Sequence, residues 1–119
     1  MAYSEYLKGV IEKEIRQKVG TCEGKKMMGG YCFFIDDKMC MGLDVDKDTG
    51  KDRLLVRIGE AAMANALNMV GCNIMSINGK PMKGFVFVEP DGFGLDHQLE
   101  CWINMAIAFN PEAKRSKKK

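Results

Sequence analysis

Two short islands rich in lysine, methionine and glycine carry the residue types and spacing that come closest to binding chemistry in this sequence. They lie at residues 25–30 and 79–84. Glycines let a backbone approach an anionic ligand, and neighbouring lysines supply positive charge. Neither island has the spacing of a phosphate-binding P-loop or of a dinucleotide-binding loop, and turn glycines beside edge-strand lysines are the alternative interpretation. The candidate binding residues are Lys25, Lys26, Met27, Gly29, Gly30, Arg57, Lys80, Met82, Lys83 and Gly84.

Four aspartates between residues 44 and 52 imitate a calcium-binding loop, because carboxylates at alternate positions can converge on a hard cation. The match fails at two points. Gly50 comes one place too late, and Leu55 occupies the twelfth position, where a bidentate glutamate is needed. We therefore expect a solvated loop and no metal site from Asp44, Asp46, Asp48 and Asp52.

The chain has five cysteines, at positions 22, 32, 40, 72 and 101, and one histidine, His97. No pair of cysteines has the C-x-x-C spacing of structural zinc sites or dithiol redox motifs. We expect free, buried thiols in a reducing compartment, and a single reactive cysteine is the alternative. No Ser-His-Asp or Cys-His arrangement is indicated, so the sequence predicts neither an enzyme nor a cofactor.

The charge of the chain is divided unevenly. The formal net charge of the 119 residues is +2, from 18 basic and 16 acidic residues. Residues 113–119 hold five of the basic residues and no acidic one, so residues 1–112 have a net charge of −3. We interpret residues 1–112 as a single domain and residues 113–119 as a basic, disordered tail. Such a tail can bind nucleic acid by releasing counterions, and a solvated terminal run is the alternative.

No apolar run approaches the roughly 20 residues that span a bilayer. Residues 1–30 lack the apolar block of a secretory signal peptide. We therefore expect a cytoplasmic protein without membrane association.

Hydrophobic periodicity predicts three helices. The first is capped by the Ser4 hydroxyl and ends at Gly20. The second covers about residues 60–70. The third covers residues 96–110 and should be anchored in the core by Trp102.

Alternation of period two predicts the strands, with turns at Asp36-Asp37 and Asn78-Gly79. Clustered hairpin strands flanked by helices indicate an α+β fold with two layers and a mainly antiparallel sheet. The element order is helix, three or four strands, helix, two strands, helix. The predicted strands are 25–28, 31–35, 38–43, 53–58, 73–77 and 84–88.

In strands 31–35 and 84–88, the residues that point to one face and the residues that point to the other are both apolar. A sheet with helices on one face would expose one of these sets to water. We therefore expect part of the second face to be an interface with another copy or with a different protein. Coverage of both faces by helices or long loops is the alternative.

Five collinear segments over about residues 1–110 resemble the TfoX N-terminal domain family. The resemblance implies a two-layer α+β fold like that of secretion chaperones and a regulatory, non-catalytic role. The family's namesake activates competence genes in bacteria together with the cyclic-AMP receptor protein and carries a second, helical C-terminal domain, so this chain resembles a stand-alone N-terminal module. The segments are Met-Ala-Tyr-Ser-Glu-Tyr-Leu at 1–7, Lys-Lys-Met-Met-Gly-Gly at 25–30, Lys-Met-Cys-Met-Gly at 38–42, Leu-Val-Arg-Ile-Gly at 55–59 and Lys-Pro-Met-Lys-Gly-Phe-Val-Phe-Val at 80–88.

The functional hypothesis is a non-enzymatic regulatory module that binds another protein or a second copy of itself. One alternative is direct nucleic-acid binding through the tail and the lysine-rich turns. Another is a small-ligand binder or enzyme, which would need a pocket where the two islands converge.

Overall fold

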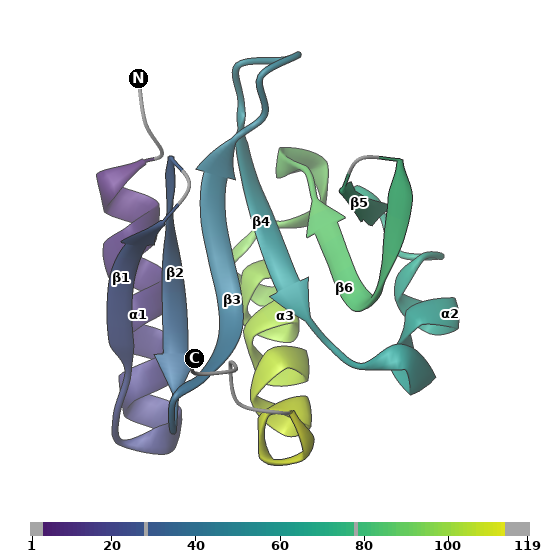
Figure 1. Cartoon of the computed structure of the whole chain (residues 1–119). Coiled ribbons are helices and arrows are strands. Elements are labelled where there is room, and N and C mark those ends of the chain that lie inside the picture. The colour runs from purple at the N-terminus through teal and green to yellow at the C-terminus, as the bar shows by residue number, and fades with distance from the viewer. Residues whose placement is uncertain (1–3, 28, 78, 114–119) are drawn as a thin grey trace.

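The computed structural model describes residues 4–27, 29–77 and 79–113. In this part of the chain, a six-stranded antiparallel sheet carries two long helices on one face (Figure 1). The strand order is β1-β2-β3-β4-β6-β5, so β1 and β5 are the edge strands. The expected α+β fold and element order are confirmed. The elements are α1 (Glu5–Val19), β1 (Glu23–Met27), β2 (Gly30–Ile35), β3 (Lys38–Val45), β4 (Asp52–Arg57), α2 (Met63–Ala66), β5 (Cys72–Ile77), β6 (Lys80–Val88) and α3 (Asp96–Phe109).

Helix α1 begins and ends where the sequence predicts. The Ser4 hydroxyl accepts a hydrogen bond from the Leu7 amide at 3.1 Å, which satisfies one of the free donors of the first turn. Gly20 ends the helix in the left-handed region, with φ +96°. Ile11 and Ile15 on the inner stripe are both fully buried.

The core lies between the two long helices and the sheet. Trp102 of α3 is 1% exposed and its indole N–H donates to the Gly92 carbonyl at 3.0 Å, so the predicted anchor is confirmed. On the sheet side, β4 contributes Leu54 and Val56, and β6 contributes Val86 and Val88, all with no exposed surface. These residues alternate along their strands and point to one face.

The turn at Asp36-Asp37 joins β2 to β3 as expected. Both residues have positive φ, +56° and +63°, which a two-residue hairpin of this kind requires and which aspartate tolerates better than most residues. The side-chain amide of Asn110 donates to the Ile35 carbonyl at 3.3 Å. This bond ties the end of α3 to the hairpin, so the buried Asn110 amide has a partner.

The second predicted helix is much shorter than residues 60–70. The structure has a 3₁₀ turn at Glu60–Ala62 and then the single α-helical turn of α2. The amides of Asn68 and Met69 bond to carbonyls three residues back, at 3.1 and 2.9 Å. Asparagine has a low helix propensity, and short 3₁₀ turns rarely extend. The apolar residues of this segment are therefore carried by short packed turns and not by a continuous helix.

Strand β6 starts at Lys80, four residues before the predicted start at Gly84, and the strand bends at Gly84. The pairing of β5 with β6 shifts register between Ile74 and Ser76, and Gly84 has φ +87°. The Gly84 carbonyl accepts hydrogen bonds from the amides of Ile58 and Gly59, at 2.8 and 3.0 Å. The ribbon of β6 turns sharply at its lower end in Figure 1. Sequence analysis began this strand at Gly84, but the glycine lies at a bend within a longer strand.

Three expectations fall on residues outside the described part of the chain. These are Met28 at the end of the first predicted strand, Asn78 of the second turn, and most of the tail. Within the described ranges, no helix is long and apolar enough to cross a membrane.

Replacing Trp102 with Phe should lower the free energy of unfolding by about 2 kcal/mol, because the Gly92 carbonyl loses its buried donor and the smaller ring packs less well. Urea titration followed by circular dichroism measures this change. The adjacent exposed Cys101 provides the control, since Cys101→Ser should change stability by less than about 0.5 kcal/mol. Equal stability of the two variants would contradict the assignment of Trp102 as an anchor.

Candidate protein-binding surface

The sheet face opposite α1 and α3 is not covered by a helix of the described chain. Figure 1 shows this face toward the viewer, with α1 and α3 behind it. In β4, Leu54 and Val56 are fully buried toward the helices, whereas Arg53, Leu55 and Arg57 are half-buried on the uncovered side. The sequence predicted this alternation, and it is confirmed.

A row of small and apolar residues crosses the middle of the uncovered face. Cys32 of β2 pairs with Gly42 of β3, Gly42 pairs with Leu55 of β4, and Leu55 pairs with Phe87 of β6. Cys32, Leu55 and Phe87 are half-buried, so each side chain remains partly accessible. One strand after another therefore contributes an apolar residue to a continuous surface.

This row forms the floor of a hollow of about 230 Å³, which we call the Gly42 hollow. One wall includes Met27 and Gly30 at the β1–β2 turn, and the other includes Met75 and Ser76 of β5. A Cβ added to Gly42 would lie 3.4 Å from the Leu55 Cβ and 3.6 Å from the Cys32 Sγ, which is ordinary contact. The hollow therefore exists in part because glycine leaves this space empty.

Two arginines lie over the phenylalanine rings of β6. The guanidinium carbon of Arg53 is 3.8 Å from the ring centre of Phe87, and that of Arg57 is 5.3 Å from the ring centre of Phe85. Burial lowers the pKa of Arg57, while its guanidinium donates to the Met39 carbonyl at 3.4 Å. Cation–π contacts of this kind stabilise both partners and leave planar surfaces toward solvent.

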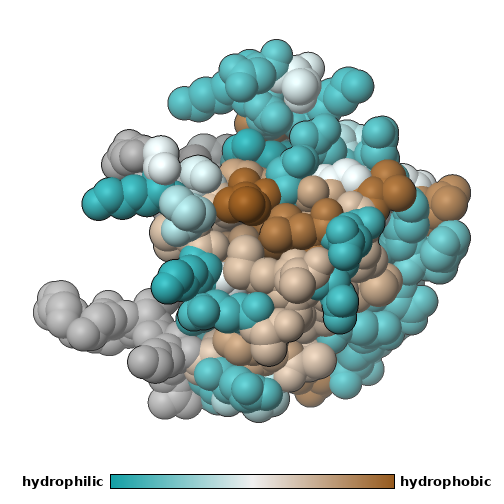
Figure 2. Space-filling model, turned by 90° about the vertical axis from the view of Figure 1, so that its right-hand side faces the viewer, coloured by the Kyte–Doolittle hydropathy of each residue, from teal (hydrophilic) through white to brown (hydrophobic). Residues whose placement is uncertain are grey.

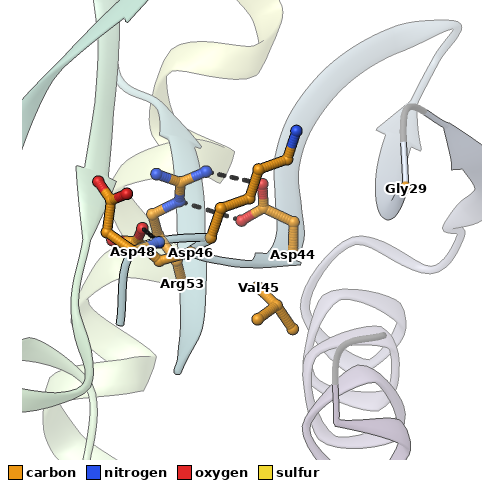
Figure 3. A pocket seen from close by; sticks show the side chains of 7 residues that line it. Gly29, Asp44, Val45, Asp46, Asp48 and Arg53 are labelled. Atoms are coloured by element: carbon orange, nitrogen blue, oxygen red, sulfur yellow. Dashed lines mark hydrogen bonds and ion pairs between the residues drawn. The ribbon is translucent and has the colours of Figure 1, made fainter. Parts of the chain in front are cut away.

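Arg53 is held in place by Asp44 on the neighbouring strand. Its Nε and Nη2 donate to the two carboxylate oxygens of Asp44 at 3.1 and 2.9 Å, and Figure 3 shows the bidentate pair. Hydrogen bonding to Asp44 raises the pKa of Arg53. A bidentate pair fixes the plane of the guanidinium, so Asp44 also positions Arg53 over Phe87.

The aspartate-rich loop between β3 and β4 borders a crevice of about 470 Å³ (Figure 3). Asp44 is paired with Arg53, and the Asp46 carboxylate accepts the Asp48 amide at 2.9 Å. Asp52 accepts the Ser4 amide at 3.1 Å and so caps the start of α1 from a distance in sequence. Among the described residues, no three His, Cys, Asp or Glu side chains are grouped to hold a metal ion.

The two lysine-rich islands lie far apart in the sheet. Lys25 and Lys26 are exposed on the edge strand β1, and Lys80 and Lys83 are exposed on β6, with β2, β3 and β4 in between. The Lys25 ammonium lies 5.1 Å from the ring centre of Phe34. The second island contributes none of the described residues that line the Gly42 hollow, so this hollow is not the pocket between the two islands that the small-ligand alternative would need.

The glycines and methionines of the islands have separate structural roles. Met27 is 41% exposed and lines the Gly42 hollow, whereas Gly29 borders the aspartate crevice. A Cβ at Gly30 would lie 2.6 Å from the Leu43 carbonyl oxygen, so only glycine fits at this position. Met82 is half-buried and Gly84 makes the bend of β6.

Apolar side chains are also exposed on the side of the molecule that bears β5 and α2. Figure 2 shows brown and tan side chains across the middle of this side, with teal side chains around them. Ile74 of the edge strand β5 is 50% exposed, and Val70 just before it is 63% exposed. Exposed apolar groups of this size next to an edge strand are typical of interaction surfaces.

The five cysteines are free thiols in different surroundings. Burial raises the pKa of Cys22 to about 11, that of Cys40 to about 12 and that of Cys72 to about 11. Burial also raises the pKa of Cys32. Cys101 is exposed on α3, which differs from the expectation that the thiols are buried.

Sequence analysis identified the apolar strands of the uncovered face but missed several residues that complete it. Gly42 and Leu55 of the floor, Met75 of the wall and Arg53 over Phe87 were not among the candidates. The signal for Arg53 and Leu55 was present, because both fall on the side of β4 opposite the core. Gly42 and Met75 become recognisable only when strand pairing is known.

Fold and surface together define a small α+β module with one covered and one uncovered sheet face. The chain belongs to the TfoX N-terminal domain family, whose model matches residues 14–110. This confirms the resemblance found in the sequence. No curated protein matches the chain, and no solved structure does. The likeness to secretion chaperones therefore stays a prediction.

Alkylation of the native protein with iodoacetamide at about pH 8 should modify Cys101 at least tenfold faster than Cys22, Cys40 or Cys72, because the thiolate is the reactive form and the others are buried with raised pKa values. Peptide mass mapping over time measures the order. Modification of Cys40 as fast as Cys101 would contradict it.

The same raised pKa values predict a loss of stability at high pH. The folded state keeps the protons of Cys22, Cys40 and Cys72 above pH 9.0, where a thiol with the ordinary pKa loses its own. Their contribution is complete below pH 9.0 and is lost as the pH rises to about 11 or 12. Replacing Cys40 with Ala should flatten this part of the curve of unfolding free energy against pH, and an unchanged slope would contradict the prediction.

Proposed function

We propose that this chain is a non-catalytic regulatory module of the bacterial cytoplasm that acts by binding another protein through the uncovered face of its sheet. The family to which it belongs is named for the competence regulator TfoX, which supports a role in transcription regulation. On this proposal the module influences its partner by contact and performs no reaction on it.

The observation that carries the proposal is the Gly42 hollow and its surroundings. Fully buried interface centres are enriched in aromatic residues, methionine and arginine. The uncovered face presents Phe85 and Phe87 with their arginines, and the methionines Met27 and Met75 form opposite walls of the hollow. Flexible thioethers suit a surface that adapts to a partner.

The proposed face has room for one large apolar side chain of a partner. Burying such a side chain contributes about 1.5–3 kcal/mol, which is the scale of an interface hot spot. The half-buried Leu55 and Phe87 would lose their remaining contact with water in the same step. A partner that covers this face therefore removes the apolar surface that the fold leaves exposed.

Filling the hollow should abolish partner binding without unfolding the protein. Gly42→Val adds a β-branched side chain whose Cβ makes ordinary contacts and whose methyl groups fill the hollow. Circular dichroism confirms that the variant keeps its fold. Affinity capture from a native bacterial extract, with the stoichiometry of each recovered protein measured, should show at least about a tenfold loss for this variant. Sedimentation at micromolar concentration shows whether the partner is a second copy.

Gly9 provides the matched control. It is exposed on α1, and a Cβ there would meet nothing within 4 Å. Gly9→Val makes the same chemical change on the opposite side of the molecule and should leave binding unchanged. Retention of a stoichiometric partner by Gly42→Val, or absence of both partner and self-association in the unaltered protein, would contradict the proposal.

Nucleic-acid binding through the basic tail remains the second prediction. Its basis is the five basic residues of 113–119 and the exposed lysines of both islands. Affinity for duplex DNA should then fall steeply with salt concentration, and deletion of residues 113–119 should reduce the slope of log affinity against log salt by about four. A flat salt response of the full chain would remove this possibility.

A further inference from the structure

The outer surfaces of α1 and α3 form a second groove, on the side of the molecule away from the uncovered sheet face. The two helices lie behind the sheet in Figure 1. The groove has a volume of about 250 Å³ and lies between their N-terminal halves. Its floor is apolar, with Val10 from α1 and with Leu99 and Ile103 from α3. Val10 is half-buried and Ile103 has no exposed surface, so the floor is continuous with the core.

Among the described residues, every charged side chain that lines this groove is acidic. Glu14 lies on the α1 side, and Asp96 and Glu100 lie on the α3 side. Lys18 stands nearby and pairs with Glu100 at 3.0 Å and with Glu14 at 3.9 Å. One cation among three carboxylates leaves a net negative charge of two around the apolar floor.

Tyr6 adds an exposed aromatic side chain to the groove. It is 81% exposed, the largest exposure among the large apolar and aromatic residues described. It stands one turn before Val10 on the same side of α1, as residues four apart on a helix do. An exposed tyrosine over an apolar floor is the kind of anchor on which interface affinity often depends.

We infer that the groove between α1 and α3 binds a basic amphipathic helix of a partner protein. Charge complementarity selects the occupant: lysine or arginine side chains of the partner helix would lie against Glu14, Asp96 and Glu100, while its apolar stripe packs on Tyr6 and Val10, which keep exposed surface over the buried Leu99 and Ile103. Two helices side by side offer a groove into which a third helix packs at the usual spacing of about 8–10 Å. This is the helix-in-groove mode of recognition.

The basic tail of the chain itself does not fit the apolar part of the groove. Residues 114–119 are Lys-Arg-Ser-Lys-Lys-Lys and contain no apolar side chain. They match the charge of the walls but supply nothing to cover the floor. The tail is therefore not the occupant that we infer, and this inference is independent of the proposed role of the Gly42 hollow.

A pair of synthetic peptides tests the inference. One is a 14-residue amphipathic helix of leucine and lysine, and the other has glutamate in place of every lysine. Isothermal titration should show binding of the leucine–lysine peptide and at least about a tenfold weaker interaction with the leucine–glutamate peptide. The triple variant Glu14→Gln, Asp96→Asn and Glu100→Gln should weaken the first peptide by about tenfold.

The control makes the same change in charge elsewhere. Asp48→Asn, Glu60→Gln and Glu112→Gln alter three exposed carboxylates outside the groove and should leave the affinity within about twofold. Tyr6→Ala should weaken binding by about tenfold, because it removes the exposed aromatic side chain of the groove. Circular dichroism confirms that each variant keeps its helices.

Several outcomes would overturn the inference. Equal binding of the two peptides shows that charge does not select the occupant, and equal effects of the two triple variants show that the groove is not the site. Stronger peptide binding after deletion of residues 114–119 shows that the tail already occupies the groove. Self-association that only the groove variant abolishes assigns the groove to a second copy.

Discussion

The burial of one sheet face beneath α1 and α3 is the constraint on which the rest of this structure depends. Leu54 and Val56 of β4 have no exposed surface, and Trp102 and Ile103 of α3 cover this side of the sheet. Burial of apolar surface contributes about 25 cal/mol per Å². A shift of one residue in strand register would turn the buried set outward, so this packing fixes which side chains can face solvent.

The two surfaces proposed to bind partners both follow from that constraint. Two long helices cover one face of the six strands. No helix of the described chain covers the other face. There, Arg53 and Arg57 lie over the rings of Phe87 and Phe85, which shields part of the aromatic surface while a smaller apolar area stays accessible. On the opposite side, α1 and α3 pack onto the sheet, and the groove with acidic walls lies between their outer surfaces. The module thus has an apolar surface on one side and an acidic groove on the other.

Local signals in the sequence were reliable where one residue determines the backbone. Ser4 and Gly20 define the ends of α1, and Asp36-Asp37 forms the turn between β2 and β3. The sequence-based prediction was wrong where a local pattern is compatible with two different structures. The periodicity of residues 60–70 fits a helix, but asparagines and long-range packing favour tight turns. Gly84 reads as a strand boundary, yet bonds from Ile58 and Gly59 hold it as a bend within β6.

The sequence by itself determined the element order, the buried face of β4, and the family to which the chain belongs. It also predicted that some apolar strand residues would remain uncovered. Only the tertiary structure decided which residues meet there. Gly42, Leu55 and Met75 come from three separate strands and share the Gly42 hollow because of cross-strand register and the bent β5–β6 pairing. Such pairing depends on the packing of the whole sheet, which no local spacing encodes.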